Sequence, residues 1–240
     1  MRNFSVVVPV HQEAGYLEGF LKELLAVLES LGLRERCLEI LFIENGSTDG
    51  SAEMCRRLAR ENARVQCRVV PGRSYGRALR CGIREARGDD LLILECDCVE
   101  AGFISQALML LDSGAADLVI GSKPLAGKGR RPFFRGVLTF LMNGMLRLFT
   151  GYRGTDTRGL KAGHGSLFQE LERSAVMDGE AFQTELVLLA WKMGKKIREV
   201  PVLAEEKRPP RLSLIRRSLG MIPDLFRLKK SLQRYGGGAL

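Results

Sequence analysis

The sequence is poor in histidine and tryptophan, and it lacks paired cysteines and long apolar runs. It holds two histidines, and its six cysteines are scattered without a CxxC pair, so we expect no structural zinc site. Scattered cysteines in mostly apolar stretches are typical of reduced, buried thiols in a cytosolic protein. No stretch reaches about 18 uncharged apolar residues, and the first apolar run is too short for a signal peptide. We therefore expect neither a membrane-spanning helix nor a secretion signal.

The composition is that of an ordinary globular chain, with 240 residues, 45% of them hydrophobic and 27% charged. This excludes a mostly disordered chain, a collagen and a disulfide-rich miniprotein. The net charge of +9 is unevenly spread. Residues 1–122 hold 14 basic and 18 acidic side chains, a net charge of −4, whereas residues 123–240 hold 23 and 10, a net charge of +13. The two halves are therefore expected to meet different partners. The basic half suits phosphates, an anionic membrane or nucleic acid, or is simply a solvated basic surface.

Short β-branched and apolar runs alternate with segments of helical apolar spacing along most of the chain. Such alternation predicts βαβ units, and hence an α/β fold with a mostly parallel sheet and helices on both faces. The predicted strands are residues 4–10, 39–43, 65–70, 91–94, 118–120 and 197–202, and the predicted helices are residues 18–31, 51–62, 76–86, 103–111, 133–149 and 179–192.

Polar side chains directly follow three of the predicted strands, at residues 11–13, 44–45 and 95–97. Because the carboxyl ends of parallel strands meet at one edge of a sheet, we expect these side chains to lie together where α/β sheets bind ligands.

Glu95 and Asp97 are separated by one residue at the end of a buried strand. In an extended strand, side chains two residues apart point the same way. Both carboxylates could then hold one hard divalent cation, Mg²⁺ or Mn²⁺, which in turn could bridge a diphosphate. The alternative is a pair of solvated acids at a strand end.

Two further segments suit a nucleotide. Glu44 and Asn45 could hydrogen-bond a base, although the segment by itself is more typical of a plain turn with Ser47 or Asp49 capping the next helix. Residues 73–80 place several arginines around a predicted helix start, where phosphate is easily bound.

The last part of the chain is basic and amphipathic. Residues 207–234 hold nine basic side chains against the single acid Asp224, interleaved with leucine, isoleucine and phenylalanine. Pro223 should divide this segment into two short amphipathic helices. The predicted helix over residues 133–149 has one narrow polar stripe, so it is either deeply buried or lies in a membrane interface.

Seven segments, taken in order, resemble the family 2 glycosyltransferases of the GT-A fold, near the dolichyl- or polyprenyl-phosphate mannose synthases. The resemblance extends over nearly all of residues 4–235. The segments are VVVPVHQEAGYL, IENGSTDGS, SYGRALRCGIREARGDDLLILECD, VIGSK, DTRGLKA, FQTELVLLAWKMGKKIREVPV and KRPPRLS.

The resemblance implies roles for individual residues. A nucleotide-sugar donor would be bound by Pro9, His11, Glu13, Glu44, Asn45 and Lys123, and a divalent cation by Glu95 and Asp97. Asp97, Asp156 and Arg208 would carry the chemistry, and Glu185 would line the donor diphosphate and the acceptor together with Lys123, Asp156 and Arg208.

The implied activity is an inverting glycosyl transfer from a nucleotide-diphosphate sugar to a polyprenyl phosphate at a membrane surface. A phosphate acceptor is already anionic and needs no general base, and Lys123, Arg208 and Arg211 would hold it. A hydroxyl acceptor would need a base. Asp156 is the candidate for that base, with Asp178 and Glu185 behind it.

We expect a catalytic domain over residues 1–206, with a nucleotide-binding half (1–122) and an acceptor half (123–206), followed by a basic amphipathic segment over residues 207–240. The protein should be cytoplasmic, with peripheral contact to an anionic inner membrane face. Nucleic acid is not an expected partner, because exposed aromatics and a nucleic-acid motif are missing. Departures from the family pattern at Glu95, Asn45 and Arg158 leave two alternatives, a soluble glycosyltransferase with a hydroxyl acceptor and a catalytically weak nucleotide-sugar-binding protein.

Overall fold

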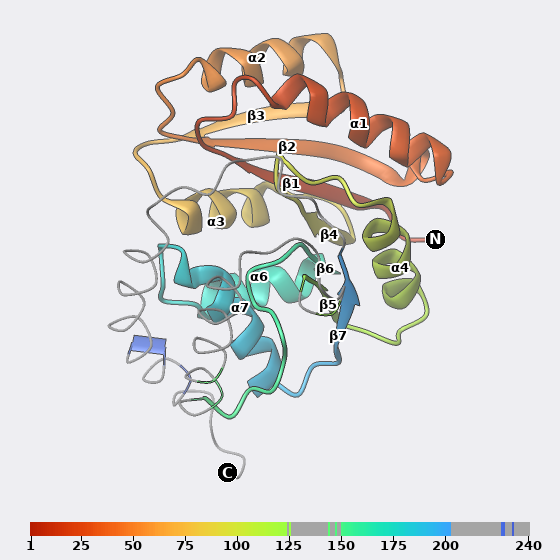
Figure 1. Ribbon diagram of the computed structural model, residues 1–240, viewed down its shortest axis with the longest axis vertical. Coiled ribbons are helices and arrows are strands. Elements are labelled where there is room, and N and C mark those ends of the chain that lie inside the picture. Colours follow the sequence, from red (N-terminus) through yellow and green to blue (C-terminus); the bar gives the residue numbers. More distant parts are fainter. Residues whose placement is uncertain are drawn as a thin grey trace.

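The computed structural model describes residues 1–123 and 150–202, together with six single residues, Leu125, Gly144, Arg147, Arg227, Leu228 and Leu232. Strands and helices alternate over this part of the chain (Figure 1). The strands are β1 (Phe4–Val10), β2 (Cys37–Asn45), β3 (Val65–Val70), β4 (Asp90–Ile93), β5 (Leu118–Ser122), β6 (Lys161–His164) and β7 (Ile197–Pro201). The helices are α1 (Leu17–Ser30), α2 (Ser51–Glu61), α3 (Tyr75–Glu85), α4 (Ala101–Asp112), α6 (Gly165–Ser174) and α7 (Ala181–Lys192), with a short 3₁₀ turn at Arg34–Arg36.

The seven strands form one sheet in the order β3-β2-β1-β4-β6-β5-β7. All neighbouring strands pair in parallel except β6, which runs antiparallel to both β4 and β5. The predicted mixed α/β fold with a mostly parallel sheet is therefore confirmed. Strand β6 and the helix α6 after it were not predicted from the sequence.

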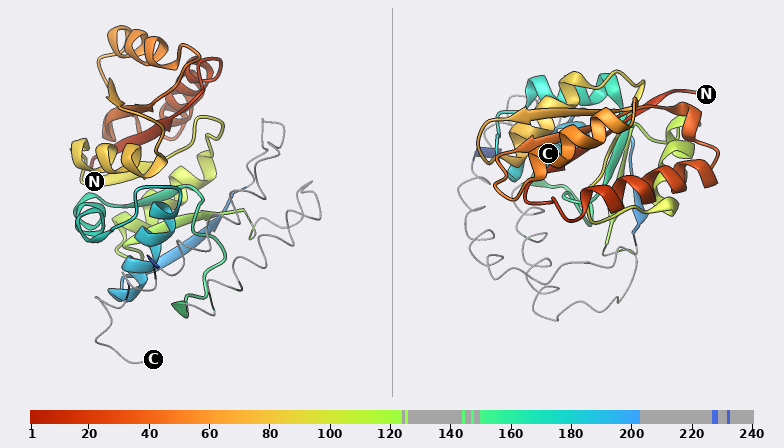
Figure 2. Two further views of the ribbon diagram at one scale, coloured as in Figure 1. Left: turned by 90° about the vertical axis from the view of Figure 1, so that its left-hand side faces the viewer. Right: turned by 90° about the horizontal axis from the view of Figure 1, so that it is seen from above.

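Strand alternation divides the core into two layers, one on each face of the sheet (Figure 2). In β1, Val6 and Val8 face the layer that contains α1, α2 and α4, whereas Val7 faces the layer that contains α3, α6 and α7. Successive side chains of a strand point to opposite faces, so a run such as VVV must be apolar throughout when both faces are covered. Helices on both faces are thus confirmed as well.

Helix α1 shows how the apolar spacing is used. Its buried side chains are Leu17, Phe20, Leu21, Leu24 and Leu28, which recur every three or four residues and form one stripe against the sheet. The helix ends before Gly32, which has a φ of 64°, and Leu33 N–H then bonds to Leu28 O at 2.8 Å. Glycine adopts this left-handed backbone without steric cost, which is why the predicted stop is confirmed.

The predicted helix over residues 133–149 and the two predicted C-terminal helices lie almost entirely outside the described residues. Of the C-terminal segment, Arg227, Leu228 and Leu232 are described, and the two leucines are buried in the layer of α3, α6 and α7. None of the helices in the described part of the chain is long and apolar enough to span a bilayer. All six cysteines are free thiols, and four of them are buried as expected, whereas Cys67 and Cys81 are only half-buried.

Candidate functional site

The candidate site lies at the carboxyl ends of the parallel strands. Strand β6 is antiparallel, so its first residue, Lys161, pairs with Ile93 near the end of β4 and with Ile120 near the end of β5. This register brings the segment before β6, residues 155–160, to the same edge as the residues that follow β4 and β5. Sequence segments that are about 60 residues apart thereby form one site.

A small cavity of about 150 Å³ lies at this edge. Its walls include Glu95 after β4, Lys123 after β5 and Asp156 before β6. These three residues were predicted from the sequence, and the structure brings them together. Arg158 lines the same cavity and adds a second cation, so carboxylates and cations face a shared space.

The geometry of the Glu95–Asp97 pair differs from the prediction. Strand β4 ends at Ile93, and Cys98 N–H donates to Glu95 O at 3.0 Å, which closes a tight turn over residues 95–98. The argument that both carboxylates point the same way along an extended strand is therefore wrong. In this turn Cys96 is buried, with its Sγ 3.9 Å from Pro9 O, so the turn is docked against the end of β1.

The carboxylates near the cavity fit a hard divalent cation in the chemistry of their donor atoms. Among the residues that the structure describes, no three His, Cys, Asp or Glu side chains converge on one point. Mg²⁺ is commonly held by one or two carboxylates, with water and substrate phosphates as the other ligands, so a two-carboxylate turn is compatible with such an ion. Burial raises the pKa of the Cys98 thiol on the cavity wall to about 12, which leaves it neutral and a poor ligand at pH 7.

The buried Lys161 lies beside the cavity and was not singled out from the sequence. Its side chain is fully buried, and Nζ donates to Gly159 O at 2.8 Å and to Gln183 Oε1 at 2.7 Å. Burial lowers the pKa of this ammonium to about 8, although Asp156 and Glu95 attract its charge. The only sequence signal was its place inside the DTRGLKA segment.

Backbone and side-chain bonds fix the segment that carries Asp156. Glu199 of β7 accepts from Thr155 N–H at 2.7 Å and from Thr155 Oγ1 at 2.5 Å. Asp156 is half-buried, and its Oδ1 accepts from Arg158 N–H at 2.9 Å. The segment therefore presents Asp156 and Arg158 from a defined turn.

The residues predicted to bind the nucleotide form a second part of the edge, where the ends of β1 and β2 meet. His11 Nδ1 lies 3.1 Å from Asn45 O, so this nitrogen carries the proton and donates to the carbonyl. The Asn45 amide donates to Val10 O at 2.8 Å and accepts from Ser74 N–H at 3.2 Å. Asn45 is only 2% exposed, and it joins three backbone segments. Its contact with a base stays a prediction.

The loops after β1 and β2 are bonded into one unit. Glu13 N–H donates to Ser51 Oγ at 2.8 Å, and Ala14 N–H donates to Asp49 Oδ2 at 3.1 Å. Asp49 Oδ1 accepts from Ser51 N–H at 3.1 Å, at the first residue of α2, but the N-cap of that helix is Gly50 and no side chain caps it, so the predicted capping by Ser47 or Asp49 is wrong. Glu44 is buried, and its Oε1 accepts from Ser47 N–H at 2.5 Å. This edge is preorganised before any ligand arrives.

Two predicted residues fall elsewhere. Glu185 is fully buried in α7, where its Oε2 accepts from Val176 N–H at 3.0 Å and Met177 N–H at 2.8 Å. These bonds place the Glu185 carboxylate in the protein interior, where it fixes the segment between α6 and α7. Arg208 and Arg211 lie outside the described residues.

Comparison with curated proteins finds relatives among glycosyltransferases. The chain is 31% identical over 228 residues to the glycosyltransferase AglD of Haloferax volcanii, covering 93% of this chain and 36% of AglD. It is 26% identical to the undecaprenyl-phosphate 4-deoxy-4-formamido-L-arabinose transferase of Edwardsiella ictaluri, covering 85% and 60% of the two chains. It is 28% identical to the dolichyl-phosphate beta-glucosyltransferase of Drosophila melanogaster, covering 92% and 73%. The chain thus spans between about a third and three quarters of these relatives' lengths.

Solved structures with the same fold are also glycosyltransferases of the GT-A class. Glucosyl-3-phosphoglycerate synthase of Mycobacterium tuberculosis, in complex with Mn²⁺, UDP-glucose and phosphoglyceric acid, matches with a TM-score of 0.68 at 18% identity over 95% of this chain and 80% of that one. The mannosyltransferase PcManGT of Pyrobaculum calidifontis, in complex with GDP-mannose and Mn²⁺, matches with a TM-score of 0.59 at 20% identity over 100% and 76%. The expected GT-A fold is confirmed.

The motif order along the chain, the strand-edge site and these relatives agree with a match of the glycosyl transferase family 2 model to residues 5–171, and the chain belongs to that family.

Proposed function

We propose that the chain transfers a sugar from a nucleotide-diphosphate sugar to a polyprenyl phosphate, with inversion at the anomeric carbon. The observation that carries the proposal is the convergence of Glu95, Lys123 and Asp156 on one cavity at the carboxyl edge. The same edge carries the bonded loops of His11 and Asn45. This arrangement supports a nucleoside site at one end of the edge and the sugar-transfer site at the other.

Glu95 and Lys123, which line the cavity, and Asp97 in the turn after Glu95 each have a role in this reaction. Glu95 and Asp97 would hold a divalent cation, which when bound neutralises charge on the departing diphosphate. Lys123 would bind phosphate oxygens as a charged donor. The acceptor phosphate would attack the anomeric carbon from the face opposite the diphosphate, and its own negative charge makes a general base unnecessary.

The polyprenyl phosphate acceptor is supported by two independent features. The relatives from Edwardsiella ictaluri and Drosophila melanogaster are named as transferases to undecaprenyl phosphate and dolichyl phosphate, respectively. The sequence after residue 122 also carries a net charge of +13, which suits an anionic acceptor at an anionic membrane face, where each cation contributes about 1 kcal/mol. The same charge supports our proposal of a cytoplasmic protein with peripheral membrane contact.

A hydroxyl acceptor is the second candidate, and Asp156 favours it. This carboxylate lines the cavity and is half-buried, as a general base for a hydroxyl would be. The two candidates differ in what Asp156→Asn does. Transfer to a phosphate should survive that change within about tenfold, whereas transfer to a hydroxyl should fall by about 100-fold or more.

The test is a transfer assay with UDP- and GDP-sugars, Mn²⁺, and either a polyprenyl phosphate or the polyprenol of the same length. We expect turnover with the phosphate alone. Asp97→Ala should reduce turnover by about 100-fold, because a metal ligand is lost. Glu35→Gln, which alters an 86% exposed acid at the opposite edge, is the matched control. Full activity of Asp97→Ala in the presence of EDTA would contradict the metal assignment, and nucleotide binding without any transfer would favour a binding protein.

A further inference from the structure

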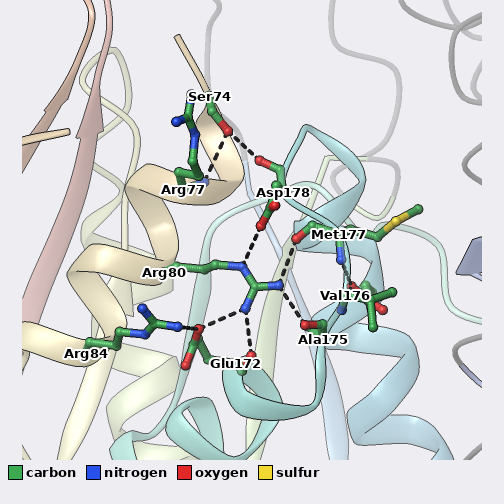
Figure 3. Close-up of polar contacts among 10 residues, drawn as sticks. Ser74, Arg77, Arg80, Arg84, Glu172, Ala175, Val176, Met177 and Asp178 are labelled. Atoms are coloured by element: carbon green, nitrogen blue, oxygen red, sulfur yellow. Dashed lines mark hydrogen bonds and ion pairs between the residues drawn. The ribbon is translucent and has the colours of Figure 1, made fainter. Parts of the chain in front are cut away.

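Arg80 of α3 lies between the two halves of the catalytic fold, and its whole guanidinium is engaged (Figure 3). Its Nε donates to Asp178 Oδ1 at 3.0 Å, and Nη1 donates to Glu172 O at 2.7 Å and Glu172 Oε1 at 2.8 Å. Its Nη2 donates to Ala175 O at 2.7 Å and Met177 O at 3.0 Å. An arginine has five N–H donors, and all five have acceptors here. The interpretation of Arg80 as a phosphate-binding cation is therefore wrong.

Three of the five acceptors of Arg80, on Ala175, Met177 and Asp178, belong to the segment between α6 and α7, residues 175–180, and the other two are on Glu172 of α6. Glu185 binds the Val176 and Met177 amides of this segment from the other side, at 3.0 and 2.8 Å. Ser74 Oγ donates to Asp178 O at 2.5 Å. The segment is thus held through its backbone carbonyls, its backbone amides and the Asp178 carboxylate. These are more hydrogen bonds to the rest of the protein than an ordinary surface loop makes.

The fit of this segment against α3 also depends on Gly76. A Cβ atom at position 76 would lie 2.3 Å from Asp178 O, which is a backbone atom and cannot rotate away. Glycine is required here by close approach, so the start of α3 and residues 178–179 are in direct backbone contact.

A continuous set of hydrogen bonds leads from Arg80 to the predicted nucleotide edge. Asp178 bonds to Ser74 through its carbonyl, Ser74 N–H bonds to Asn45 Oδ1 at 3.2 Å, and Asn45 Nδ2 bonds to Val10 O at 2.8 Å. His11 then contacts Asn45 O at 3.1 Å. The position of residues 74 and 45 is coupled in this way to a segment of the other half of the fold.

We propose that Arg80 is a positioning residue for donor binding: by holding residues 175–178 against α3, it sets the place of Ser74 and Asn45 at the nucleotide edge. The inference rests on the proposed function, because it assumes that this edge binds the nucleoside. Arg80 itself touches no substrate in this proposal.

Two variants of the full chain test the inference in different ways. Arg80→Lys keeps the charge but can no longer reach five acceptors in a planar fork. Gly76→Ala keeps every polar side chain and displaces the 178–179 backbone. It should still fold, because alanine forms helices better than glycine. Gly76→Ala therefore tests whether the position of residues 178–179 against α3 affects nucleotide binding, even if Arg80→Lys folds poorly.

Matched controls are available on the same elements. Arg84→Ala removes a second cation from Glu172, whose Oε1 lies 2.6 Å from Arg84 Nη2, and the Arg84 side chain is 65% exposed and bonds to α6 instead of residues 175–178. Gly19→Ala places a methyl group in α1, where nothing lies within 4 Å. Both controls should bind nucleotide within about twofold of the wild type.

Calorimetry in the presence of Mn²⁺ measures the dissociation constants of UDP and of GDP for each variant. The temperature is one at which circular dichroism shows every variant to be fully folded. Steady-state kinetics then give kcat and the KM for the nucleotide-sugar donor. We expect Arg80→Lys and Gly76→Ala to weaken nucleotide binding by about five- to tenfold and to raise donor KM in parallel. A merely structural role would lower the melting temperature and leave the dissociation constant unchanged, and this result would overturn the inference. A wild-type protein that binds neither nucleotide would instead overturn the proposed function.

Discussion

At the scale of single residues, the chemistry of one amide explains a departure from the family pattern. At position 45 the side chain must donate to Val10 O, at 2.8 Å, and accept from Ser74 N–H, at 3.2 Å. An amide does both, whereas a carboxylate only accepts. Asn45 therefore suits this backbone better than the acid that the family pattern would place there.

We predict that Asn45→Asp lowers the free energy of unfolding by about 1–3 kcal/mol, because Val10 O loses its donor and faces a carboxylate in a buried place. Urea denaturation at pH 7 measures this. Asn62→Asp is the control, since Asn62 Oδ1 only accepts, from Arg64 N–H at 3.0 Å, and a carboxylate can replace it with a smaller cost. Equal stability of Asn45→Asp and the wild type would show that the Val10 bond contributes nothing.

At the scale of elements, α3 packs on the sheet through a residue without a side chain. A Cβ atom at Gly82 would lie 2.3 Å from Val7 Cγ1 and 3.3 Å from Ile43 Cγ1. Both neighbours are buried β-branched residues with few alternative rotamers. The approach of α3 to β1 and β2 therefore depends on glycine.

Gly82→Ala should destabilise the protein although alanine favours the helix. The helix gains about 1 kcal/mol, but overpacking against a rigid strand typically costs about 1–3 kcal/mol, so the net change is unfavourable or close to zero. Gly102→Ala in α4, where nothing lies within 4 Å, should instead be neutral or stabilising by up to about 1 kcal/mol. Thermal unfolding of the two variants gives the comparison, and a Gly82→Ala protein as stable as Gly102→Ala would contradict the packing argument.

At the scale of the whole molecule, the carboxyl ends and the amino ends of the parallel strands differ in the side chains that they carry. The carboxyl edge carries the candidate site, and the amino edge is closed by buried acids. Glu39 accepts from Ser5 Oγ at 2.9 Å, from Gln66 Nε2 at 2.7 Å, and from Arg87 Nη2 at 2.8 Å. These bonds join β1, β2 and β3 to the segment before β4.

This arrangement predicts acid sensitivity. Burial raises the pKa of Glu39, but the hydrogen bonds from Arg87 and Ser5 outweigh it and hold the pKa below its ordinary value of 4.5. A lowered pKa in the folded state means that this carboxylate stabilises the protein above about pH 4.5 and that the contribution is lost as the pH falls through the folded-state pKa. Glu39→Gln should therefore be less stable than the wild type at pH 7, and the two stability curves should converge below pH 4.5. Urea denaturation from pH 7 to pH 3 tests this, and parallel curves would contradict it.

The sequence by itself determined the elements whose signal is local. Strands β1 and β3 have the predicted bounds, and the predicted helices α1–α4 begin and end within about two residues of the observed ones. Apolar periodicity and turn residues are properties of neighbouring positions in the sequence, so they predict strands and helices without knowledge of any tertiary contact. The order of motifs likewise indicated the family without any contact being known.

The tertiary structure alone decided the elements and contacts that depend on distant partners. The segment KAGH of β6 has no strand pattern, and it is a strand because β4 and β5 pair with it on both sides. Residues 95–98 form a turn closed by the bond from Cys98 N–H to Glu95 O, and this turn packs against the end of β1 through Cys96. The acceptors of Arg80 lie 92–98 residues further along the chain, so its turn toward the interior has no local signal. A side chain's partners follow from which elements the fold places together, and that placement is a property of the whole packed chain.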